Sequence, residues 1–333
     1  MNIAIVGATG NVGRKILEVL EKKKFPIDNL YLVASSKSVG SKIKFRGQEH
    51  EILDLDDFDF SKAKITFFAA GGKISEKFVQ EASKKSMIID NSSFFRMDPD
   101  VPLIVPQVNS EDLKKIKKNI IANPNCSTAQ LVIALKPLHD LFGIKRAVIS
   151  TYQSVSGGGK AQMDELIEQT KLVLNNKKVI SKNFTKQIAF NAIPHIDEFS
   201  QDGYTKEELK MVNETKKILD KNIGLSATCV RVPVKTSHSE SVNIEFENEY
   251  DLNTVKKILR NASGCRVIDE EKDGGYITPL EAEDEYLTFI SRIRKDHSNK
   301  KAVNIWVVSD NLLKGAALNS VQIAECLEER LKK

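Results

Sequence analysis

Short apolar runs alternate with polar, glycine-rich segments through the first part of the chain. Runs of this kind, bounded by turn residues, are typical of buried strands. They occur at residues 2–6, 30–34, 65–70, 86–90 and 120–122. After the first run, apolar residues recur with the spacing of one helix face, at Ile16, Leu17, Val19 and Leu20. We therefore expect a doubly wound α/β domain here.

The pattern continues to the end of the chain. Further strands are predicted at residues 147–152, 227–232, 241–246 and 304–308. Helical patterns cover residues 131–135, 161–174 and 205–219, and a last one passes through Ile323 and Leu327. Prolines predict an extended loop over residues 99–106, and polar residues predict solvated surface over 169–182. The final helix is able to pack back on the first domain.

Composition narrows the class of protein. A chain of 333 residues with 41% hydrophobic content suggests about two domains. Its 50 basic and 45 acidic residues are interspersed, which gives no basic face for nucleic acid. The four cysteines form no metal-ligand or disulfide pattern, and no signal peptide or membrane-spanning run is found. We expect a cytoplasmic protein without a metal and without nucleic-acid or membrane partners.

A glycine-rich turn joins the first strand to the first helix. Residues 7–13 read Gly-Ala-Thr-Gly-Asn-Val-Gly, which departs from G-x-G-x-x-G by one residue but keeps the glycines that let a pyrophosphate approach a helix N-terminus. The alternative is an ordinary turn between a strand and a helix. Because both flanking elements are present, nucleotide binding is the better prediction.

The end of the second strand bears on the choice of cofactor. Hydroxyls and a cation, with Ser36 and Lys37 among them, stand where an NAD-specific fold usually carries an acidic residue for the ribose. Such groups suit a 2′-phosphate, so we predict NADP, bound by these two residues. A solvated polar loop is the competing interpretation.

Arg96 lies just beyond the strand at 86–90, where a doubly wound sheet binds its ligands. A guanidinium can hold a phosphate or a carboxylate through two parallel hydrogen bonds. The alternative is a surface ion pair with Asp98 or Asp100.

Residues 123–128, Asn-Pro-Asn-Cys-Ser-Thr, place Cys126 between a strand-like run and a helix-like run. Unpaired N–H groups and the partial positive charge of a helix N-terminus stabilise a thiolate, which makes this cysteine a candidate nucleophile. For an arbitrary cysteine, a role as a small buried hydrophobe is more common.

His238 is the best candidate for an acid or base among the five histidines, because it stands between serines in a predicted loop. His139 and His297 are interpreted as surface residues. Arg231 and His238 would point to opposite faces of one continuous strand, so a turn is needed for them to act together. Pro233 with the following polar residues provides one.

Glycines make the loop at residues 153–159 free to approach a ligand closely. On the helix predicted over 205–219, Thr205 is an N-cap candidate, and Glu214 and Lys217 are three residues apart and share a face. The periodicity alone favours an exposed ion pair of little energetic value for those two.

These segments together resemble aspartate-semialdehyde dehydrogenases over nearly the whole chain. The likeness is carried by residues 7–13, 123–128, 154–157, 231–238 and 309–315, of which the second and fourth are the most specific. It implies a Rossmann-type NADP-binding domain (1–127) interrupted by an α/β catalytic and dimerisation domain (128–310). The C-terminal helix (311–333) would return to the first domain.

The resemblance implies NADP-dependent interconversion of L-aspartyl 4-phosphate and L-aspartate 4-semialdehyde. This reaction serves lysine, methionine, threonine and diaminopimelate biosynthesis. The partners would be the small-molecule substrate and inorganic phosphate, and the assembly a homodimer or a homotetramer.

Residue roles follow from the same resemblance. Cys126 would form an acyl thioester and His238 would move protons. Substrate contacts would come from Gln153, Arg231 (α-carboxylate) and Glu214 (ammonium), and phosphate contacts from Arg96 and Lys217. The cofactor would contact Thr9, Gly10, Asn11, Val12, Ser36, Lys37, Ser156, Gly157 and Asn311.

Two other classes of function compete. One is another thioester-forming reductase on the same scaffold, acting on N-acetyl-γ-glutamyl phosphate or malonyl-coenzyme A. Arg231 and Glu214 favour a substrate with free carboxylate and amino groups instead. The other is a non-catalytic NADP-binding sensor, against which the presence of both Cys126 and His238 argues.

Overall fold

The computed structural model describes residues 1–200 and 202–331, and the chain divides into two compact units. The first unit contains Met1–Asn125 and Ala316–Lys333, and the second contains Cys126–Gly315. The chain thus leaves the first unit, builds the second, and returns. The predicted fold class, a Rossmann-type domain interrupted by a second α/β domain, is confirmed.

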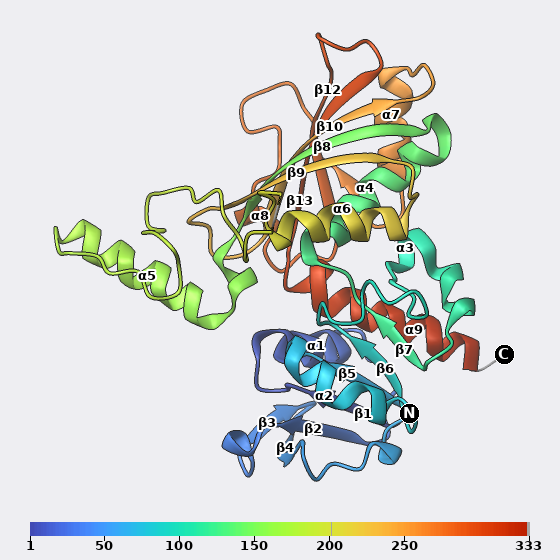
Figure 1. Ribbon diagram of the computed structural model, residues 1–333, viewed down its shortest axis with the longest axis vertical. Coiled ribbons are helices and arrows are strands. Elements are labelled where there is room, and N and C mark those ends of the chain that lie inside the picture. The colour runs from blue at the N-terminus through green and yellow to red at the C-terminus, as the bar shows by residue number, and fades with distance from the viewer. Residues whose placement is uncertain (201, 332–333) are drawn as a thin grey trace. The chain divides into compact units, whose positions relative to one another are not determined.

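A seven-stranded sheet forms the centre of the first unit, in the order β3-β4-β2-β1-β5-β6-β7 (Figure 1). Its strands are β1 (Ile3–Val6), β2 (Leu30–Ala34), β3 (Lys42–Phe45), β4 (Gln48–Asp54), β5 (Ile65–Phe68), β6 (Met87–Asp90) and β7 (Ile120–Ala122). Neighbouring strands are parallel except β3 and β4. Because β1 pairs with β2 on one side and β5 on the other, the strand order reverses beside it, which is where such sheets bind ligands.

The helices of the first unit are α1 (Asn11–Lys22), α2 (Gly72–Ala82), α3 (Pro106–Asn109) and α9 (Leu318–Leu331). Short 3₁₀ turns cover Ser36–Ser38, Phe60–Lys62 and Ser110–Lys115. The helix α9 packs against α1 and is fastened by the Lys23–Glu325 ion pair of 2.9 Å. Asn319 Nδ2 also donates to Asn123 Oδ1 at 2.7 Å. The predicted return of the last helix to the first unit is confirmed.

A six-stranded sheet in the order β11-β12-β13-β10-β8-β9 forms the second unit. Its strands are β8 (Ile144–Gln153), β9 (Gly224–Arg231), β10 (His238–Phe246), β11 (Cys265–Val267), β12 (Thr288–Lys295) and β13 (Ala302–Ser309). Its helices are α4 (Cys126–Phe142), α5 (Lys160–Leu174), α6 (Lys206–Ile218), α7 (Leu252–Asn261) and α8 (Pro279–Ala282). A 3₁₀ turn covers Val155–Gly158 and a π-helical turn covers Leu313–Ala317.

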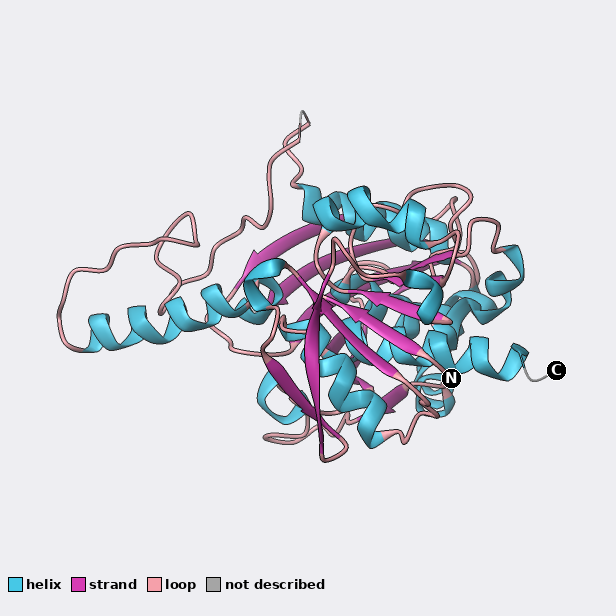
Figure 2. Cartoon of the chain, turned by 90° about the horizontal axis from the view of Figure 1, so that it is seen from below, coloured by secondary structure: helices cyan, strands magenta, loops and turns pink. Residues whose placement is uncertain are grey.

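The main core of the second unit lies between this sheet and the helices α4, α6 and α7. Residues such as Leu135 on α4 and Val242 on β10 are fully buried there. The helix α5 extends away from the sheet (Figure 2). No helix in the described part of the chain is both long enough and apolar enough to span a membrane.

Three local predictions are wrong. Pro106 begins α3 instead of continuing an extended loop, since proline is well tolerated at the first helical position. Gln169 is buried, not part of a solvated surface, and its Oε1 accepts the Ile188 N–H at 2.8 Å. His238 is the first residue of β10, not a loop residue, because β10 pairs with β13 from that position onward.

Candidate active site

The glycine turn after β1 has the tight geometry that a dinucleotide site requires. Gly7 has a φ of +84°, and a Cβ on it would lie 2.6 Å from the carbonyl oxygen of Ala69. A Cβ on Gly13 would lie 2.2 Å from the Gly7 carbonyl oxygen, so α1 packs against the turn without a side chain between them. Gly10 is the N-cap of α1 and supplies no side-chain oxygen to its first turn. The first turn of α1 therefore suits an anionic ligand.

The predicted cofactor residues of the first unit lie around this turn and at the end of β2. The segment Thr9 to Val12 forms the turn and the start of α1. Ser36 and Lys37 have exposed side chains in the 3₁₀ turn that follows β2, the strand next to β1. Hydroxyl and ammonium groups at that position are available to a phosphate. Their contact with a cofactor stays a prediction.

Arg96 is buried, and its guanidinium is held by the backbone. Its Nε donates to the Asn123 carbonyl and its Nη2 to the Asn91 carbonyl, each at 2.9 Å. Asp98 and Asp100 form ion pairs with Lys118 and Lys117, respectively. Two backbone carbonyls after β6 and β7 therefore fix the guanidinium at the carboxyl end of the first sheet.

Cys126 is the first residue of α4, as its sequence context predicts. Gly315 packs against it so closely that a Cβ on the glycine would lie 2.5 Å from the Cys126 Cβ. The helix N-terminus favours negative charge on the sulfur. Arg231 also lies within electrostatic range, since a negative Cys126 raises the pKa of Arg231, although burial lowers it by more. The thiol is thus placed where a thiolate is stabilised.

The ends of three neighbouring strands bring Gln153, Arg231 and His238 together. Gln153 pairs in register with Arg231, and β10 joins β8 at Ser239 and Tyr152. A Cβ on Gly157 would lie 3.1 Å from Arg231 Nη1 and 3.2 Å from His238 Nε2. Arg231 and His238 therefore converge on one point, and the turn that their spacing requires lies between β9 and β10.

The His238 ring is held by Ser154. The Ser154 backbone N–H donates to His238 Nδ1 at 3.0 Å, and the Ser154 hydroxyl lies 3.0 Å from the same nitrogen. Because a backbone N–H only donates, Nδ1 must accept, so the neutral ring carries its proton on Nε2. Burial lowers the pKa of His238 well below its ordinary value, and the charge of Arg231 adds to this. The ring is neutral near pH 7.

Hydrogen bonds hold the residues around this histidine in place. Arg231 Nη1 donates to the Ser154 carbonyl at 2.7 Å. Asn311 Oδ1 accepts from the Ser154 hydroxyl at 3.2 Å, the Ser156 hydroxyl at 3.0 Å and the Ser237 N–H at 2.9 Å. The glycine loop is fixed by these bonds. Asn311 thus has a structural role, while its predicted cofactor contact stays a prediction.

The exposed ion pair considered for Glu214 and Lys217 is wrong for the glutamate, whose residue is 1% exposed. Both residues lie on α6, whose N-cap is Thr205 as predicted, in a capping box with Glu208. Gln153 Nε2 donates to Glu207 Oε1, also on α6, at 3.3 Å. Glu207 was not predicted as a site residue, because an acidic residue in a first helical turn is usually a capping feature.

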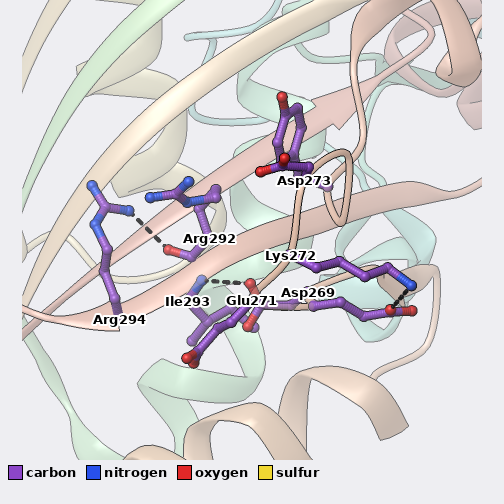
Figure 3. Close-up of a pocket in the computed structure, with 9 residues that line it drawn as sticks. Asp269, Glu271, Lys272, Asp273, Arg292, Ile293 and Arg294 are labelled. Atoms are coloured by element: carbon purple, nitrogen blue, oxygen red, sulfur yellow. Dashed lines mark hydrogen bonds and ion pairs between the residues drawn. The ribbon is translucent and has the colours of Figure 1, made fainter.

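Pocket shape does not identify these residues. A hollow of about 470 Å³ in the second unit is lined by charged side chains that include Asp269, Asp273, Arg292 and Arg294 (Figure 3). None of the predicted site residues lines it. Arg231 lines a smaller hollow of about 230 Å³ together with Gln162 and residues of the 183–197 segment, which include the acidic Asp197.

Family models match most of the chain. Residues 2–116 match "Semialdehyde dehydrogenase, NAD binding domain", and residues 135–314 match "Semialdehyde dehydrogenase, dimerisation domain". The first match covers the glycine turn and the second covers Gln153, Arg231 and His238. Together with the fold, they define a nicotinamide-nucleotide oxidoreductase of the semialdehyde dehydrogenase class.

Curated relatives narrow the family. Aspartate-semialdehyde dehydrogenase of Rickettsia bellii is 51% identical over 326 residues, which is 97% of this chain and 96% of that protein. The chain belongs to the aspartate-semialdehyde dehydrogenase family, so the family recognised in its sequence is confirmed. The Aquifex aeolicus protein of that name is likewise 51% identical, over 98% of this chain and 97% of its own length.

Solved structures agree. Aspartate semialdehyde dehydrogenase II from Vibrio cholerae superposes with a TM-score of 0.96 at 45% identity, covering 98% of both chains. The Candida albicans enzyme, solved with NADP, has a TM-score of 0.74 at 26% identity, again covering 98% of both chains. A nicotinamide cofactor is therefore common to this family, and the fold seen here is the fold of its members.

Proposed function

We propose that this protein catalyses the NADP-dependent interconversion of L-aspartyl 4-phosphate and L-aspartate 4-semialdehyde through a Cys126 thioester. The reaction would supply lysine, methionine, threonine and diaminopimelate biosynthesis in the cytoplasm. The observation that carries the proposal is the convergence of Arg231 and His238 at Gly157, in the unit whose α4 begins with Cys126. Membership of the family supports it.

The residues of the first unit fit a dinucleotide phosphate. Gly7 and Gly13 leave space that a Cβ would fill, and the first turn of α1 suits an anion. Ser36 and Lys37 would hold the 2′-phosphate, which is the basis for NADP over NAD. When bound, this cofactor would exchange a hydride with the acyl carbon. Ser156, Gly157 and Asn311 are the proposed contacts from the second unit.

Cys126 would carry the covalent step. Its thiolate attacks the acyl carbon of the acyl phosphate, a C–S bond forms, and the C–O bond to phosphate breaks so that phosphate leaves with the electron pair. The resulting thioester is reducible to the aldehyde level, which releases the thiolate again. The reverse sequence consumes aldehyde and phosphate. Backbone N–H groups at the start of α4 would stabilise the oxyanion.

His238 would move the proton. Its Nε2–H can donate to the oxyanion of a tetrahedral intermediate and take the proton back when the intermediate collapses. The Ser154 contacts that fix the tautomer support this assignment. A low ring pKa keeps the group neutral between steps.

Substrate recognition would use fixed charges. Arg231 Nη1 donates one hydrogen bond to the Ser154 carbonyl. The other donors of the guanidinium are proposed to bind the substrate α-carboxylate. Glu214 would bind the ammonium group, and Gln153 would orient the reacting carbon. Arg96 and Lys217 would bind phosphate.

Assembly into a homodimer, or a homotetramer built from dimers, is proposed from the second sheet. On the face of the sheet away from α4, Tyr152 is 39% exposed. Its ring packs against Trp306, with the two ring centroids 5.4 Å apart. Partly exposed aromatic residues on an open sheet face are typical of a subunit interface. The match to a dimerisation domain over residues 135–314 supports this surface.

Phosphate dependence tests the reaction directly. The purified protein should reduce NADP when given L-aspartate 4-semialdehyde and phosphate, and should not when phosphate is withheld. Cys126→Ala should abolish the activity. Survival of activity in that variant would refute the thioester. Equal or better turnover of N-acetyl-glutamate semialdehyde or malonyl-coenzyme A would refute the substrate assignment.

A further inference from the structure

A second layer of polar residues lies beneath the proposed catalytic residues. Glu240 follows His238 by two positions on β10, so both side chains lie on the same face of the sheet. Gln130 follows Cys126 by four positions on α4, so those two share a helix face. Glu240 and Gln130 are both 0% exposed. One layer thus contains a residue from the nucleophile's helix and a residue from the histidine's strand.

The hydrogen bonding of this layer is incomplete with an ionised glutamate. Gln130 Nε2 donates to the His238 backbone carbonyl at 3.3 Å. Among the residues that the structure describes, Gln130 Oε1 and both carboxyl oxygens of Glu240 have no hydrogen-bond partner. Gln130 lies close enough to Glu240 to affect its carboxyl, and a buried carboxylate without a partner is very costly.

A proton on Glu240 resolves the deficit. A carboxylic acid has one O–H donor, and Gln130 Oε1 is the acceptor that lacks a partner. Burial raises the pKa of Glu240 well above its ordinary value, and the opposing effect of Gln130 is smaller. The Cys229 thiol on β9 lies within electrostatic range of this carboxyl and of Glu207 and Glu208 on α6.

We propose that Glu240 is a neutral positioning residue, whose O–H donates to Gln130 Oε1 so that the Gln130 amide holds the backbone of His238. The chain of contacts runs from β10 through Glu240 to α4 and back to the His238 carbonyl. It fixes the start of β10 relative to the helix that begins with Cys126. This inference rests on the proposed catalytic role of His238 and adds a residue that does not touch the substrate.

Substitutions at Glu240 separate a neutral donor from a charged group. Glu240→Gln keeps a donor for Gln130 Oε1 and should retain kcat within about twofold. Glu240→Leu keeps the volume but removes the donor, and should lower kcat on the order of tenfold with KM unchanged, as expected for a misplacement of about half an ångström. Glu245→Leu, which removes a partly exposed carboxylate that pairs with Lys145 on the same sheet, is the matched control.

Gln130→Leu removes the same proposed hydrogen bond from the other side and should reproduce the kcat loss of Glu240→Leu. Thermal unfolding of each variant checks that the protein is folded. A Glu240→Leu or Gln130→Leu protein that is folded and keeps full kcat would overturn the proposal, as would a Glu240→Gln protein as impaired as Glu240→Leu. His238→Asn is measured alongside. Full activity in that variant would refute the role of His238 itself, which distinguishes the two failures.

Discussion

Gly157→Ala perturbs the point where Arg231 and His238 meet. The added Cβ would lie 3.1 Å from Arg231 Nη1 and 3.2 Å from His238 Nε2. Because such atoms pack at about 3.5 Å, both side chains must retreat by about 0.3–0.4 Å. Neither moves freely, since both are hydrogen-bonded to Ser154.

The expected cost follows from this displacement. A misplacement of about 1 Å costs about 100-fold in rate, so a shift of about a third of that should lower kcat roughly fivefold. The assay is NADPH formation at saturating semialdehyde, phosphate and NADP. Gly158→Ala is the matched control in the same turn, because the atoms nearest to its Cβ belong to the end of the Gln162 side chain, which is outside the proposed site.

Equal losses in the two variants would refute the reasoning, because the change would then report backbone flexibility and not contact with the catalytic pair. A Gly157→Ala enzyme with unchanged kcat would show that the two side chains need not be held at this point.

Three further outcomes are expected. Because the pKa of His238 is lowered by burial and by Arg231, its protonation should impair kcat/KM only well below pH 6.5, and an acid limb at or above that value that vanishes in His238→Asn would contradict this. Glu165→Ala should lower the free energy of unfolding by about 2–4 kcal/mol in denaturant titrations, because the Lys182 and Asn183 N–H groups lose their acceptor. Glu168→Ala, on the exposed side of α5, should leave the free energy of unfolding unchanged. Gly13→Ala should weaken NADP binding in a direct titration, because its Cβ would overlap the glycine turn.

The stabilising effect of Glu165 has a pH dependence with a definite sign. Burial raises the pKa of this carboxyl, but the Lys182 and Asn183 hydrogen bonds together outweigh it and lower the pKa. A carboxyl with a lowered pKa in the folded state contributes stability above its unfolded pKa and loses it as the pH falls through the folded value. The advantage of the native protein over Glu165→Ala should therefore shrink under acid conditions. An advantage that grows on acidification would contradict the assignment.

Much of the fold was predictable, because its signals are local. The run at 30–34 predicts β2 with its observed bounds, and Thr205 is the N-cap of α6 as predicted. Strands β3, β4, β11 and β12 were not predicted, since charged residues at their exposed positions give them a composition that is typical of loops. Such strands are stabilised by pairing with neighbours that are distant in sequence.

Site residues were predictable only where the residue type itself indicates a chemical role. Cys126 at a helix start and His238 beside serines could be singled out from their neighbours in sequence. The burial of Glu214 could not, because helix periodicity shows that two residues share a face but not whether that face is covered. The resemblance to a family, not the pattern, suggested its role.

Ser154 shows why the remaining site residues could not be predicted from the sequence. Its N–H holds His238 Nδ1, its carbonyl accepts from Arg231 and its hydroxyl donates to Asn311. Two of these contacts use backbone atoms that every residue other than proline has, so no residue type marks the position. What selects the tautomer of His238 is the path of the chain after β8, and that path depends on pairing with β9 and β10. The proton on Nε2 is therefore a property of the sheet, and a substitution that shifts the end of β8 should impair proton transfer without touching either catalytic side chain.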